Sequence, residues 1–265
     1  MDSRIVNAKA ESYKDRSIRL TPVLFDRLGL VKKSIHLRVE EFSISCVPFD
    51  LSLTKASLLA FLSEREVDFF KKLPVKTNKF SVSWKSPYST KPETFFIGCR
   101  IQTFRKPEGD SPYCFIDIEF MTAPLAFKEL LVSYFVEVDE AERFYNEAPD
   151  AELSSEQIEK SFKCIHVSLM KEGCSAEHLK IIGLSSKSLR LFGELDGALP
   201  VQGEVLEFEP TEGDPSCLLK GECVQAAPSA EAPGFVSITV KLQFSAYAHS
   251  RIRSAVGWGA KGPKP

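Results

Sequence analysis

The sequence predicts a mainly β fold made of two antiparallel barrels, each followed by a helix. Three observations predict it. Apolar and polar side chains alternate with period two in both halves of the chain, which places one set on a buried face and the other in solvent. A stretch with helical spacing follows the strands of the first half, and a weak internal repeat relates the two halves. A length of 265 residues also favours two domains.

Strand-like alternation dominates the first half of the chain. The sequence Ser63-x-x-Glu66 has the form of a capping box and predicts a short helix to about Lys72, ended by Pro74. The predicted strands are residues 34–47, with a bend near Glu40 and Glu41, and residues 80–85, 95–104 and 113–120.

A helix over residues 126–145 is predicted to close the first domain. Its apolar residues recur at helical spacing, with charged residues between them. The aromatic side chains cover more than a narrow stripe, so part of this helix is expected either to pack within the chain or to meet another surface. The aromatic residues concerned are Phe127, Tyr134, Phe135, Phe144 and Tyr145.

The composition along the chain predicts four parts. Residues 1–30 form an N-terminal arm, in which Thr21-Pro22 predicts a helix start, and residues 31–148 form the first domain. Residues 149–161 are predicted to be a linker, because this stretch is acidic, poor in large apolar residues and contains Pro149. Residues 162–265 form the second domain. Its predicted elements are strands at 162–169, 178–182, 189–192, 205–208, 217–224 and 235–244 and a terminal helix at 247–256.

Composition and motifs argue against several classes of protein. With 34 basic and 36 acidic residues the formal net charge is −2, which disfavours a strongly basic binder of nucleic acid polymers. We expect a cytoplasmic protein without membrane insertion, because no apolar run approaches the roughly 20 residues of a membrane helix and no signal peptide is visible. Seven cysteines without a CxxC pair and four scattered histidines predict reduced structural thiols and no metal site.

Enzymatic chemistry has no support in the sequence. The chain contains no GxSxG, HExxH, GxxxxGK[ST] or GxGxxG motif, so neither a catalytic site nor a cofactor is expected.

The internal repeat places the same short pattern in each half. The segment DLSLTKASLLAF runs from Asp50 to Phe61, and GLSSKSLRLF runs from Gly183 to Phe192. Each has Leu-Ser before a small polar turn and then an apolar strand. In each half a later strand ends in phenylalanine, at Phe120 and at Phe244, and leads into a predicted helix. Two copies of a barrel with a C-terminal helix account for this pattern.

These motifs resemble those of the PilZ family, whose domains have a six-stranded barrel and a helix. The family's DxSxxG turn is matched by Asp50 and Ser52, while Lys55 stands at the glycine position. The strand from Phe115 to Phe120 is similar to a later strand of the family. The family's RxxxR element has no full counterpart upstream, where the nearest cations are Arg27, Lys32 and Lys33. The resemblance implies binding of cyclic di-GMP, which many members bind.

The resemblance assigns a role to each candidate binding residue in the first domain. Asp50 would accept the N1 and N2 donors of a guanine, and Ser52 would add a hydroxyl contact. Arg27, Lys32 and Lys33 would supply positive charge for the phosphates. Lys55 predicts a changed turn or a displaced ligand, since glycine in such turns permits positive φ or close approach. The alternative for Asp50 and Ser52 is a purely structural role in a strand-ending turn.

The second copy is expected to have lost the site. Gly183 stands at the position of the aspartate and Ser188 at that of the glycine.

Two functions therefore remain open. The first is a bacterial non-enzymatic regulatory protein that acts as a cyclic di-GMP receptor, changes its domain arrangement on binding and so affects motility. The alternative is a ligand-free PilZ adaptor that works through contacts with an unidentified protein partner. A small nucleic-acid-binding barrel would need a basic face with interleaved aromatic residues, which the balanced charge disfavours.

Overall fold

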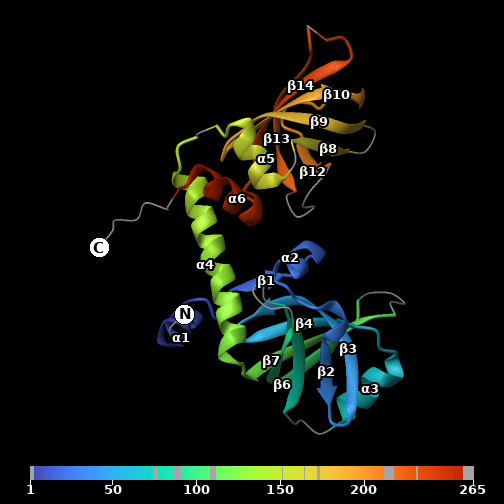
Figure 1. The fold of residues 1–265 in the computed structure, drawn as a ribbon. Coiled ribbons are helices and arrows are strands. Elements are labelled where there is room, and N and C mark those ends of the chain that lie inside the picture. Colours follow the sequence, from blue (N-terminus) through green and yellow to red (C-terminus); the bar gives the residue numbers. More distant parts are fainter. Residues whose placement is uncertain are drawn as a thin grey trace. The chain divides into compact units, whose positions relative to one another are not determined.

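The computed structural model describes residues 3–73, 77–85, 91–107, 112–150, 152–163, 165–171, 174–211, 218–230 and 232–258. The chain divides into two compact units, Met1–Phe135 and Val136–Pro265. The predicted boundaries at residues 30, 148 and 161 remain predictions. Each unit contains one antiparallel barrel followed by a helix, so the predicted mainly β fold class is confirmed (Figure 1).

In the first unit, six strands close into a barrel. They follow the order β3-β2-β5-β6-β7-β4, and pairing between β3 and β4 closes the ring. The strand β1 lies beside the end of β3, outside this ring. The elements of this unit are α1 (Ser3–Ser12), β1 (Ser17–Arg19), α2 (Pro22–Arg27), η1 (Lys32–Ser34), β2 (His36–Val39), β3 (Phe42–Ser52), β4 (Lys55–Ala60), α3 (Glu64–Lys72), β5 (Asn78–Trp84), β6 (Glu93–Arg105), β7 (Cys114–Thr122) and the first part of α4 (Leu125–Glu147).

Two helix starts of this unit form as the sequence predicts. The side chain of Thr21 accepts a hydrogen bond from Leu24 N at 3.2 Å and caps α2, whose first residue is proline. Ser63 and Glu66 form the predicted reciprocal capping box of α3. Pro74, expected to end α3, lies outside the described residues.

The predicted bent strand 34–47 is instead two strands. β2 and β3 pair antiparallel, with Val39 opposite Phe42. Glu40 lies in the left-handed region with φ of 52°, which reverses the chain rather than bending it. Alternation alone did not separate the two strands, because Phe42, the first residue of β3, is an exposed aromatic.

The helix α4 contributes to the core of both units. In the first unit, the ring of Phe127 is buried and lies against Phe95 and Phe120, with centroid distances of 5.8 and 5.9 Å. In the second unit, Phe144 is buried and contacts Trp258 at 5.3 Å. These aromatic residues therefore pack within the chain, one of the two alternatives expected for this helix.

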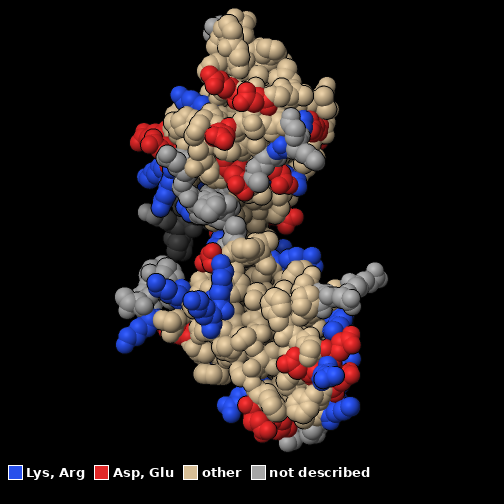
Figure 2. All heavy atoms as spheres, turned by 90° about the vertical axis from the view of Figure 1, so that its right-hand side faces the viewer, with Lys and Arg blue, Asp and Glu red and all other residues tan. Residues whose placement is uncertain are grey.

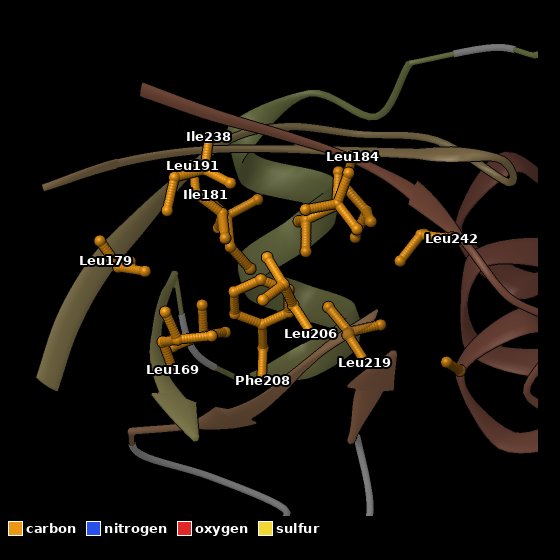
Figure 3. Packing of buried hydrophobic residues seen from close by; sticks show 14 of the residues in the cluster. Leu169, Leu179, Ile181, Leu184, Leu191, Leu206, Phe208, Leu219, Ile238 and Leu242 are labelled. Carbon is orange, nitrogen blue, oxygen red and sulfur yellow. The ribbon is translucent and has the colours of Figure 1, made fainter. Parts of the chain in front are cut away.

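The second barrel repeats the order of the first. Its strands follow β10-β14-β13-β12-β8-β9, and pairing of β9 with β10 closes the ring. Leucine, isoleucine and phenylalanine side chains from facing strands fill its interior (Figure 3). The elements are the end of α4, α5 (Ser155–Phe162), β8 (His166–Lys171), β9 (Cys174–Leu184), β10 (Ser188–Glu194), β11 (Asp196–Gly197), β12 (Val205–Pro210), β13 (Leu219–Pro228), β14 (Phe235–Leu242) and α6 (Ala246–Val256).

The stretch predicted as a linker contains a helix of the second core. Ser154 and Gln157 form a capping box that starts α5, and Ile158 and Phe162 are buried. The acidic residues of this short helix lie on its exposed face. The strand predicted from residue 162 begins at His166, because Phe162 ends α5 and Lys163 adopts the left-handed conformation.

The remaining predictions about composition concern thiols, metals and membranes. Five cysteines are free and buried, and burial raises the pKa values of Cys46 and Cys99 to about 12. Cys164 and Cys217 lie outside the described residues. Within the described ranges, no cluster of three or more histidine, cysteine or acidic residues could hold a metal ion, and no helix could cross a membrane. Figure 2 shows charged side chains of both signs on the drawn faces of both units.

Candidate functional site

Two serines build the same turn in the two barrels. The Oγ of Ser52 accepts hydrogen bonds from the backbone N–H of Thr54 at 3.2 Å and of Lys55 at 2.9 Å. The Oγ of Ser185 accepts from Lys187 at 3.2 Å and from Ser188 at 2.9 Å. Both hydroxyls are buried and occupied by the turn. The repeat seen in the sequence therefore corresponds to one structural device used twice.

A groove of about 750 Å³ lies on the outer face of the first barrel beside this turn. It crosses the strands β1, β3, β4, β6 and β7. Its charged lining is balanced, with three cationic and three acidic side chains. These are Arg19, Lys55, Arg105, Asp50, Asp117 and Glu119.

Strand register brings a row of polar residues across this groove. Arg19 lies opposite Asp50, Asp50 opposite Ser57, and Ser57 opposite Asp117. The guanidinium of Arg105 reaches the far end of the row, where Nε and Nη2 donate to the Asp117 carboxylate at 2.6 and 2.8 Å. The result is an arginine-aspartate pair at each end with one serine between them.

The two arginine-aspartate pairs differ in strength. Arg105 forms a short bidentate pair with Asp117, and the hydroxyl of Ser57 donates to the same carboxylate at 2.7 Å. These bonds, led by those from Arg105, hold the pKa of Asp117 below its usual range. Arg19 approaches Asp50 only to 3.3 and 3.5 Å. The Arg19 pair is therefore the weaker of the two.

The structure brings together only part of the predicted site. Asp50, Ser52 and Lys55 line the groove. The predicted cations do not: the guanidinium of Arg27 lies 5.8 Å from the ring of Tyr134, and Lys32 pairs with Asp26 at 3.2 Å. Lys33 lies in η1, outside the groove lining.

Sequence reasoning missed most of the polar side chains of the groove, among them Arg19, Ser57, Arg105 and Asp117. Alternation within β7 was a usable signal for Asp117, because Ile116 and Ile118 point into the core and leave Asp117 on the outer face. No spacing rule connects Arg19 with Arg105, which lie at opposite ends of the first domain's sequence.

The corresponding place in the second barrel is filled by the chain itself. Gly183 lies opposite Arg190, as Asp50 lies opposite Ser57. Arg190 forms an ion pair with Glu152, and a Cβ at Gly183 would collide with both side chains. Leu153 N donates to Leu184 O at 2.8 Å and fixes this segment on the barrel. Glycine is thus required here for close packing rather than for a turn.

Comparison with protein families identifies the first unit. Residues 4–127 match the model of the PilZN3 domain. The N-terminal part of the chain is therefore similar to a PilZN3 domain. The predicted resemblance to the PilZ family is thereby confirmed. Strands β1 to β7 and the groove all lie within the matched PilZN3 residues.

Solved structures of similar topology come from several bacteria. The chain is 13% identical to the Borreliella burgdorferi PlzA protein in complex with c-di-GMP, with coverage of 96% and 98% of the two chains and a TM-score of 0.44. It is 10% identical to the Bacillus subtilis inhibitor of motility MotI/DgrA (84% and 94%, TM-score 0.26) and 8% identical to Escherichia coli YcgR in complex with c-di-GMP (97% and 89%, TM-score 0.24). A search of curated proteins gave no significant match.

Proposed function

We propose that this chain is a cytoplasmic, non-enzymatic regulator that binds cyclic di-GMP in the groove of its PilZN3 domain. The observation that carries the proposal is the gathering of Asp50, Ser52 and Lys55 along one groove of about 750 Å³. This volume lies within the range of about 300–1,000 Å³ common for small-molecule sites.

The chemistry of the groove suits a guanine nucleotide. A carboxylate such as that of Asp50 accepts both N–H groups of the guanine Watson–Crick edge, and guanidinium groups bind phosphates or the guanine O6 and N7 atoms. The groove offers both kinds of group side by side. Ser52 acts through the turn, because its hydroxyl holds the backbone that positions Asp50. In this proposal Arg27, Lys32 and Lys33 add positive charge to the domain without lining the groove.

Regulation requires that the nucleotide bind one arrangement of the chain better than another. We assign this response to the two units, whose arrangement would change on binding and alter contact with a protein partner. The effect on motility predicted from the sequence belongs to the same proposal.

A ligand-free adaptor is the second candidate function. It is favoured by the ion pairs that already satisfy Asp50 and Asp117, and by the filled position at Gly183 in the second barrel. In that case the arginine-aspartate row serves only to stabilise the outer face of the first barrel.

Calorimetric titration of the full chain separates the two functions. We expect saturable binding of cyclic di-GMP, with no comparable binding of cyclic di-AMP or GTP. The absence of binding heat at nucleotide concentrations up to about 1 mM would contradict the receptor function and favour the adaptor. A dissociation constant of about 1 mM corresponds to a binding free energy of about −4 kcal/mol.

A further inference from the structure

The groove contains two arginines that no linear motif connects. Arg19 comes from β1 and Arg105 from the end of β6, yet both line the groove that holds Asp50. More than half of each side chain is exposed, at 66% for Arg19 and 55% for Arg105. The upstream cations predicted from the sequence, Arg27, Lys32 and Lys33, lie outside this lining.

Both guanidinium groups lie on one aromatic surface. The guanidinium carbon of Arg19 is 4.4 Å from the centroid of Phe49, and that of Arg105 is 5.4 Å from the centroid of Phe115. The two rings contact each other edge to face, with 5.2 Å between centroids. Stacking on a ring restricts the orientation of a guanidinium and presents its fork of donors to the groove.

The two arginines are held unequally. Arg105 is bound by the short bidentate pair with Asp117, whereas the donors of Arg19 lie 3.3 and 3.5 Å from Asp50. A phosphate oxygen would replace the Asp50 carboxylate at Arg19 more easily than it would displace Asp117 from Arg105. Such an exchange would leave the Asp50 carboxylate available to a base.

We propose that Arg19 and Arg105 together form the phosphate-binding pair of the groove, in place of the arginine pair that the sequence lacks. Arg19 exchanges Asp50 for a ligand phosphate, and the released Asp50 accepts the N–H groups of guanine. Arg105 keeps its bond to Asp117 and contacts the ligand with its exposed edge. This inference rests on the proposed binding of cyclic di-GMP, and it names the residues that recognise the anionic part of that ligand.

The test compares glutamine variants in the full chain. We expect Arg19→Gln and Arg105→Gln each to weaken cyclic di-GMP binding by about 10-fold or more, as for loss of a hydrogen bond to a charged group. The affinity of each variant should also depend less on salt concentration than that of the unmodified chain. Arg105→Lys keeps the charge but not the planar fork of donors. Its affinity for cyclic di-GMP should therefore lie between that of the unmodified chain and that of the Arg105→Gln variant.

Arg190→Gln is the matched control. Arg190 is also a half-exposed arginine paired with a carboxylate on a barrel strand, but it belongs to the second unit. We expect its affinity to stay within about twofold of the unmodified chain. Thermal unfolding of each variant shows whether a loss of affinity reflects a loss of folding.

The outcomes separate this inference from the proposed function. If the unmodified chain binds cyclic di-GMP and the folded Arg19 and Arg105 variants bind it equally well, the proposed phosphate-binding role of the arginine pair is wrong, while the proposed receptor function is supported. If instead the triple change of Arg27, Lys32 and Lys33 to glutamine abolishes binding, the phosphate site lies where the sequence predicts. No binding by the unmodified chain would overturn both.

Discussion

Replacing Asp50 by alanine should weaken the binding of cyclic di-GMP by about 10- to 100-fold, the loss expected when a charged acceptor of two hydrogen bonds is removed. Asp50 is half-buried at the wall of the groove and lies two residues before Ser52, which organises the turn. The variant leaves the N–H groups of the guanine edge without their acceptor. Titration calorimetry of the full chain measures the effect.

The same change should leave the fold intact. The Asp50 carboxylate pairs with Arg19 at 3.3 Å on the protein surface, and such exposed pairs contribute about 0–1 kcal/mol. Glu152→Ala is the matched control, because it removes the acidic partner of an arginine in the second unit. Equal affinities of the Asp50→Ala variant and the unmodified chain would remove Asp50 from the site.

Replacing His249 by alanine should lower the free energy of unfolding of the second unit by about 3 kcal/mol, from a lost buried ring and two backbone groups left without partners. The Nε2 of His249 lies 2.8 Å from Ser186 O, and the Nδ1 accepts from Ser245 N at 3.0 Å. These bonds join the β9–β10 turn to the start of α6. Urea denaturation at pH 7.5 measures the loss, and the exposed His178→Gln is the control.

His249 also makes this stability depend on pH. Burial lowers its pKa below the ordinary value of about 6.5, because the ring is desolvated among Tyr145 and Phe244. At a pH above about 6.5 the His249 ring is neutral in both the folded and the unfolded chain, and the full stability is present. At a lower pH the unfolded chain binds a proton at His249 more readily than the folded chain does, so the free energy of unfolding falls as the pH decreases. An equal change from pH 7.5 to 5 in the His249→Ala variant would contradict this account.

The sequence predicted the fold well wherever the local pattern decides the structure. Alternation located β14 and β6 to within a few residues, and the capping signals at Thr21 and Ser63 located the starts of α2 and α3. Prediction from the sequence failed where a short element gains its stability from packing, as for the helix in the stretch predicted to be a linker. The helix α5 is acidic by composition and is held by Ile158 and Phe162 in the second core.

The candidate site was only half predictable for a similar reason. Asp50 and Ser52 belong to one turn, so a local motif reveals them. Arg19, Ser57, Arg105 and Asp117 meet only because five strands pair in a particular register, which no single segment encodes. Two of the predicted upstream cations have other partners: Lys32 pairs with Asp26, and the guanidinium of Arg27 lies over the ring of Tyr134.

Hydrogen–deuterium exchange of the full chain with and without cyclic di-GMP tests the central claim most directly, because it locates the ligand. The account predicts slower exchange on binding in β1, in the β3–β4 turn around Thr54 and Lys55, and at the end of β6. These backbone segments carry Arg19 and Arg105 and adjoin Asp50. Protection confined to residues 136–265, or no change anywhere at saturating nucleotide, would contradict a binding site in the first barrel.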